Sequence, residues 1–157
     1  MWNNKISKHG SNVRLRLTWL VYAIWLMLSV SVHAQSAEIL VISHPEVNQD
    51  AVNQMQLRRI FSLKQRTWND GSPISLIVLS SDNDQHVAIL CQQLKIFPYQ
   101  LEREWNKLIY SGQASPPFVA VSSAEMQSLV TSTPGAIGYL YSESASANVN
   151  IIEVEGP

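Results

Sequence analysis

Apolar and polar positions follow two periods along the chain, one typical of strands and one typical of helices. Five short, mainly apolar runs are bounded by turn residues. The first of them, 38–43, is nearly continuous, which indicates a strand buried on both faces. The predicted strands are 38–43, 74–79, 118–121, 136–141 and 149–154.

Three amphipathic segments begin with a capping box, in which the side chain at the helix start accepts a hydrogen bond from the first turn. The boxes start at Asn53, Asp82 and Ser122, each followed three residues later by Gln or Glu. A fourth helix begins at Pro98, whose missing N–H suits the first turn, and Gly112 ends it. Strands that alternate with such helices favour a three-layer α/β/α domain with a mixed sheet.

Apolar residues spaced three and four apart predict which helix faces pack on the sheet. Cys91 falls on such a face, so we expect a small buried side chain rather than a reactive thiol. Val121 and Met126 are placed to form a hydrophobic staple at the start of the last helix. Other residues expected to be buried are Leu57, Ile60, Phe61, Leu90, Leu94, Trp105 and Leu108.

The N-terminal segment has the pattern of a secretory signal. Four basic residues and no acid precede an uncharged apolar run at 17–32, and Val-His-Ala follows before Gln35. The alternative is a membrane anchor, but this run is shorter than the roughly 20 apolar residues that span a bilayer. We therefore expect cleavage of residues 1–34, leaving 35–157 as a single domain in the periplasm.

Charge and composition narrow the function. The first 34 residues carry four of the 11 Lys and Arg and none of the 12 Asp and Glu, so the remaining domain has a net charge of about −5. Such an acidic domain is poorly suited to nucleic acid, and we expect no nucleic-acid partner. No spacing of residues typical of metal binding or nucleophilic catalysis is present. We predict no enzyme activity, no metal and no cofactor.

The two histidines of the domain are far apart in sequence. We interpret His44, which follows a predicted strand, as a turn histidine, and the alternative is that it lines a cleft. We expect His86, in the first turns of a helix, to be solvated.

One loop is a candidate anion-binding site. Ser80, Ser81, Asp82, Asn83 and Asp84 lie between a predicted strand and a predicted helix, where hydroxyls and backbone N–H groups favour a negative ligand. The two aspartates oppose this, because they would repel an anion by on the order of a few kcal/mol. The alternative is that both carboxylates only cap the helix and compensate its dipole.

A local basic cluster accompanies the first predicted helix. Arg58, Arg59, Lys64 and Arg66 lie on its outer face and at its C-terminal end, where the helix dipole favours cations. We interpret this cluster as a solvated helix face. The alternative is that it docks an acidic partner.

Two sequence blocks resemble a known family. Leu-Arg-Arg-Ile-Phe-Ser-Leu-Lys at 57–64, with Thr-Trp-Asn-Asp-Gly-Ser-Pro-Ile at 67–74, resembles the L-x-x-I-F-x-G-K … W-x-D-G-x-x-I block of phosphate-type periplasmic solute-binding proteins of ABC transporters. Thr-Pro-Gly-Ala-Ile-Gly-Tyr at 133–139 resembles the closing P-G-A-I-G-Y block of that family. The resemblance covers roughly 39–141 and implies the fold of one lobe of a type II periplasmic binding protein.

The chain also departs from the family pattern. The family has two lobes with phosphate between them, and this chain has length for one, resembling the second. The anion loop of the family carries an Arg and a Ser-Gly-Thr, both of which are missing from 79–85, and Leu63 replaces a Gly. The resemblance therefore implies the fold of the family more strongly than its binding of phosphate.

Two hypotheses of function follow. The first is a single-lobe, solute-binding-like module associated with transport of phosphate or another anion, which it binds weakly through the loop at 80–84. The second is an interaction protein that no longer binds a ligand and is accessory to a membrane receptor, transporter or sensor. The sequence predicts neither the ligand nor the oligomeric state.

Overall fold

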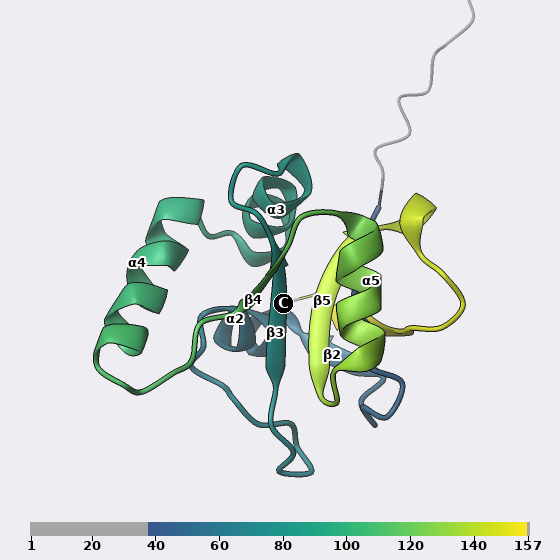
Figure 1. The fold of residues 1–157 in the computed structure, drawn as a ribbon, viewed down its shortest axis with the longest axis horizontal. Helices are drawn as coiled ribbons and strands as arrows, with labels where there is room; N and C mark the ends of the chain where they lie inside the picture. The colour runs from purple at the N-terminus through teal and green to yellow at the C-terminus, as the bar shows by residue number, and fades with distance from the viewer. Residues whose placement is uncertain (1–37, 157) are drawn as a thin grey trace, which may run out of the picture. The chain divides into compact units, whose positions relative to one another are not determined.

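The computed structural model describes residues 38–156, and in this part of the chain six strands form one mixed sheet. Figure 1 shows the helices arranged around the sheet. The elements are β1 (Ile39–Ser43), β2 (Ala51–Asn53), α2 (Gln54–Phe61), β3 (Ser75–Leu79), α3 (Asp84–Ala88), the π-helical turn η1 (Ile89–Leu94), α4 (Pro98–Tyr110), β4 (Phe118–Ala120), α5 (Ser123–Ser132), β5 (Ala136–Tyr141), the 3-10 turn η2 (Ser142–Ser144) and β6 (Asn150–Glu155).

The strand order is β2-β6-β1-β5-β3-β4. The strand β1 lies at the centre and pairs antiparallel with both β5 and β6. The strand β3 pairs parallel with β5 and with the edge strand β4, and β2 pairs parallel with β6. Parallel and antiparallel pairs thus occur in one sheet, as the sequence predicts.

Helices cover both faces of the sheet, which confirms the predicted three layers. On one face, α5 approaches so closely that a Cβ added to Gly138 would lie 2.5 Å from the sulfur of Met126. On the other face, the next residue of β5, Tyr139, packs against Phe61 of α2 with ring centroids 5.8 Å apart. Both aromatic side chains are fully buried. The central strands are therefore buried on both sides.

The predicted strands are confirmed with small shifts at their ends, and one strand was missed. The missed strand, β2, is three residues long and pairs with residues 153–155 of β6. So short a run carries no recognisable period. It lies at the sheet edge directly before α2, in the stretch between the predicted strand at 38–43 and the cap at Asn53.

Two of the three predicted N-cap residues are confirmed, without the return bond from the third helical residue that completes a capping box. The side chain of Asn53 accepts a hydrogen bond from the N–H of Gln56 at 2.7 Å, and that of Ser122 accepts from Glu125 at 3.2 Å. The second helix begins one residue later than predicted. There Asn83, not Asp82, is the N-cap, and it accepts from the N–H of Gln85 at 2.9 Å.

The predicted staple does not form. Val121 is 78% exposed, whereas Met126 is buried. The N–H of Val121 instead donates to the carboxylate of Glu125 at 2.8 Å, which holds the chain in a direction that turns its side chain outward. The start of α5 is therefore fixed by polar contacts rather than by an apolar pair.

Most of the predicted core is confirmed. Leu57, Ile60, Phe61, Leu90 and Leu94 are buried, and Trp105 and Leu108 are half-buried. The prediction for Cys91 was wrong, because its side chain is exposed. The segment from Ile89 to Leu94 is a π-helical turn. Such a turn has more residues per turn than an α-helix, so Cys91 does not lie on the buried face that α-helical spacing predicts.

The two sequence blocks meet in space at one turn. The indole N–H of the buried Trp68 donates to the carbonyl of Gly135 at 3.0 Å, and the N–H of Ser75 donates to the same carbonyl at 3.1 Å. Leu63, where the family has glycine, adopts a positive φ of 59° directly after α2. Glycine adopts this left-handed conformation readily, whereas leucine rarely does.

The predicted signal segment, 1–34, lies outside the described residues. Between residues 38 and 156, none of the helices combines the length and the apolar character needed to cross a bilayer.

Candidate functional site

The loop at 80–84 connects the end of β3 to the start of α3. Its backbone is already engaged on the sheet side, since the N–H of Ser80 donates to Ala120 at 3.2 Å. The N–H of Asn83 donates to the carbonyl of Ser80 at 2.9 Å and closes the turn. Ser81, Asp82 and Asp84 are exposed. The structure therefore brings the five predicted ligand residues together in one exposed turn.

The polar groups of this turn bind mainly to one another. A hydrogen bond from the Ser80 side chain holds the pKa of the exposed Asp82 below its usual range. The side chain of Asn83 is used to cap α3, which is a helix of five residues. Two carboxylates and few uncommitted donors make a poor cradle for a fully charged anion. Binding of an anion by this loop stays a prediction.

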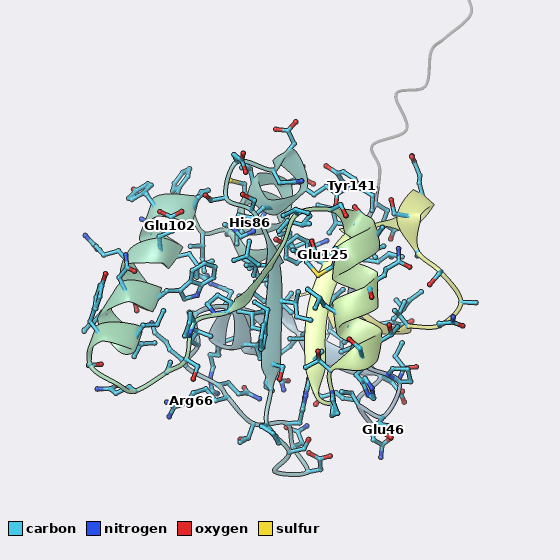
Figure 2. The ribbon with its side chains drawn as sticks, in the orientation of Figure 1. Glu46, Arg66, His86, Glu102, Glu125 and Tyr141 are labelled. Carbon is cyan, nitrogen blue, oxygen red and sulfur yellow. The ribbon has the colours of Figure 1, made fainter. Side chains whose placement is uncertain are left out.

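Directly behind the loop lies a buried polar pair. His86 projects from α3 toward the sheet (Figure 2) and is 2% exposed, so the expectation that it is solvated was wrong. Its Nδ1 lies 2.5 Å from the hydroxyl of Tyr139, and that hydroxyl accepts a hydrogen bond from the N–H of Leu79 at 2.9 Å. The pair joins α3 to β5 and to the end of β3.

Burial sets the charge state of this pair. It lowers the pKa of His86 and raises the pKa of Tyr139, because removal from water disfavours the charged forms of both side chains. Both groups are therefore neutral at neutral pH. His86 anchors the loop from within, and helical spacing could have shown this, since Ile89 and Leu90 lie three and four residues further on the same buried stripe.

His44 has the surroundings of a turn histidine. It follows β1, and its Nδ1 accepts a hydrogen bond from the N–H of Glu46 at 3.2 Å. Its Nδ1 also lies 3.9 Å from the carboxylate of Glu46. Within residues 38–156, no three His, Cys, Asp or Glu side chains are grouped so that they could hold a metal ion.

The basic cluster faces a groove. Arg58, Arg59 and Lys64 line a groove of about 750 Å³ together with Arg103 of α4, whereas Arg66 lies outside this lining. The contribution of α4 was missed in the sequence analysis, because nothing in the sequence places Arg103 beside α2.

Comparisons with known proteins identify the fold. No family model matches the chain, and no curated protein does. Among solved structures, a protein described as a phosphate ABC transporter substrate-binding protein from Clostridium perfringens, with bound phosphate, matches with a TM-score of 0.63 and 17% identity over 75% of this chain and 45% of its own. An ABC-type phosphate transport receptor from Vibrio cholerae matches with a TM-score of 0.60 and 12% identity over 75% of this chain and 46% of its own.

PstS from Borrelia burgdorferi matches with a TM-score of 0.55 and 17% identity over 76% of this chain and 47% of its own. The chain has the fold of one lobe of these proteins. It spans about half of their length. The resemblance carried by the blocks at 57–74 and 133–139 is thereby confirmed as a likeness of fold.

Proposed function

We propose that the protein is a single-lobe, solute-binding-like module associated with transport of phosphate or another anion. The observation that carries this proposal is the match of its fold to one lobe of phosphate-binding transport proteins, one of them solved with bound phosphate. The chain spans about half of those proteins. We propose that a membrane transporter, a receptor or a second chain supplies the other wall of a closed site. We propose no enzymatic activity for the domain.

The isolated domain is expected to bind phosphate with a dissociation constant weaker than about 1 mM, which corresponds to less than about 4 kcal/mol of binding free energy. A single lobe leaves the anion half in water, where each contact is worth little. Asp82 and Asp84 add repulsion, and the loop has no Arg. Titration calorimetry of the purified exported protein measures this directly, and micromolar affinity would contradict it.

A charge-matched pair of variants locates the site. Asp82→Asn with Asp84→Asn removes the repulsion and should tighten phosphate binding if the loop is the site. Glu102→Gln with Glu143→Gln removes the same charge from exposed positions elsewhere and should have no effect. An equal response of the two pairs would place the weak binding outside the loop at 80–84.

The second candidate function is an interaction protein that has lost ligand binding. The bonding within the loop favours it, because the Asn83 side chain is already committed to capping α3. The same calorimetry distinguishes the two functions. Failure of the Asp82→Asn, Asp84→Asn variant to bind phosphate, sulfate or a carboxylate would favour the interaction protein.

We also propose export to the periplasm with removal of residues 1–34. Expressed in a Gram-negative host, the protein should be recovered from the periplasmic fraction with Gln35 as its first residue. N-terminal sequencing checks this. A membrane-bound protein that retains Met1 would show that the apolar run is an anchor.

A further inference from the structure

The groove between α2 and α4 gathers positive charge from two helices. Arg58 and Arg59 come from α2, Lys64 follows it, and Arg103 comes from α4. The lining contains one acidic residue, Glu104. Four of the seven Lys and Arg in residues 38–156 therefore face one groove, in a part of the chain that carries 12 Asp and Glu. Random placement on an acidic surface would not concentrate cations in this way.

Most of this charge is not neutralised within the domain. Lys64 forms an ion pair with Glu104, with 3.0 Å between its Nζ and a carboxylate oxygen. Within the described chain, Arg58, Arg59 and Arg103 form no ion pair, and the first two are exposed on the outer face of α2. Three guanidinium groups are thus free to meet carboxylates from outside.

The pKa of Glu104 reports the electrostatic potential in the groove. The hydrogen bond and the charge of Lys64 lower its pKa, and the charges of Lys107 and Arg103 lower it further. A carboxylate at this place is therefore stabilised in its charged form. An incoming carboxylate would meet the same field, which solvent and salt screen at the exposed positions.

The shape of the groove fits a chain segment better than a small ion. Its lining includes apolar atoms of Met55, Ile96 and Leu101 beside the cations. A second hollow of about 460 Å³ shares Asn53, Met55 and Arg59 with the groove and extends to Trp68. A groove lined by basic side chains and apolar side chains, and extended by a second hollow, suits a peptide that combines acidic and apolar side chains.

We propose that this groove docks an acidic segment of a partner protein, with Arg58, Arg59 and Arg103 contacting its carboxylates and Met55 contacting its apolar side chains. A phosphate ion would be left largely in water in so wide a groove. A flat membrane surface would contact the exposed arginines but not Leu101, which lines the groove and is 1% exposed. The inference is independent of phosphate binding by the loop at 80–84, because the two sites share no residue.

The test uses the purified exported protein and two labelled peptides. One peptide alternates pairs of Glu with Leu, and the other has Gln in place of every Glu. Fluorescence anisotropy at low salt should show binding of the Glu peptide that weakens as salt is added, and at least about tenfold weaker binding of the Gln peptide.

Paired variants separate the groove from the overall charge. Arg58→Gln with Arg59→Gln should weaken binding of the Glu peptide at least about tenfold. Arg66→Gln with Lys95→Gln removes the same charge from exposed positions outside the groove lining and should change binding less than about threefold. Gln is a good helix former, so both variants should fold, and circular dichroism checks this.

Three outcomes would overturn the proposal. Equal losses in the two double variants would show general electrostatic attraction. Binding to vesicles that contain phosphatidylglycerol, with none to the Glu peptide, would assign the groove to a membrane surface. Absence of binding of the Glu peptide at low salt would contradict the docking function. This result would not bear on phosphate binding by the loop at 80–84, which calorimetry measures separately.

Discussion

Replacement of Phe61 by alanine is expected to lower the free energy of unfolding by about 3–5 kcal/mol, the range for an aromatic side chain removed from a core. Phe61 is the last residue of α2, is fully buried and packs against Tyr139 of β5. The cavity would open between a helix and the central sheet, where α2 has no other aromatic side chain to fill it. Chemical denaturation of the two proteins measures the difference.

The control for this variant is Phe97→Ala. Phe97 is also aromatic, but it is 59% exposed and stacks only on Tyr99 among the aromatic side chains of residues 38–156. We expect its loss to cost less than about 1 kcal/mol. Similar losses for the two variants would show that the face of α2 had been assigned incorrectly.

Local signals in the sequence predicted most of the secondary structure. The cap at Asn53, the cap at Ser122 and the pair of Pro98 and Gly112 each act within a few residues, so each could be recognised without tertiary information. The exposed Cys91 shows where this fails. The turn containing it is π-helical, and such a turn is indistinguishable from an α-helix by apolar spacing over so few residues.

The position of the candidate loop was predictable, but its bonding was not. A strand end followed by a capping residue placed the loop at 80–84, whereas the choice of Asn83 over Asp82 as the cap depends on a shift of one residue. His86 was misjudged because the neighbouring acids suggested solvent. Its partner, Tyr139, lies 53 residues away, and only the fold brings the two together.

The groove likewise depends on tertiary structure. Arg58 and Arg59 were visible as a cluster, yet a cluster on one helix has the pattern of a solvated face. What changes the interpretation is α4, which adds Arg103 as a second wall, and the indole of Trp105 fixes this helix by donating to the carbonyl of Phe61 at 2.7 Å. A shift of α2 in the Phe61→Ala variant would therefore also change the groove between α2 and α4.

The turn that joins the two sequence blocks depends on Gly135. Its φ is +70°, and a Cβ added there would lie 2.1 Å from the backbone carbonyl oxygen of Pro73. That oxygen cannot move aside as a flexible side chain would. Because Gly135 also accepts hydrogen bonds from Trp68 and Ser75, any shift of the turn disturbs the contact between the two blocks.

Gly135→Ala is therefore expected to destabilise the domain by about 2–5 kcal/mol, as the sum of roughly 1–2 kcal/mol for a left-handed alanine and roughly 1–3 kcal/mol for the forced contact. Gly112→Ala is the matched control, because Gly112 has a φ of +71° with no atom within 4 Å of the added Cβ. The Gly112→Ala variant should lose only the free energy needed to hold an alanine in the left-handed conformation. The difference between the two variants in urea denaturation measures the contact with Pro73, and equal losses would mean that the turn accommodates a methyl group without strain between the blocks.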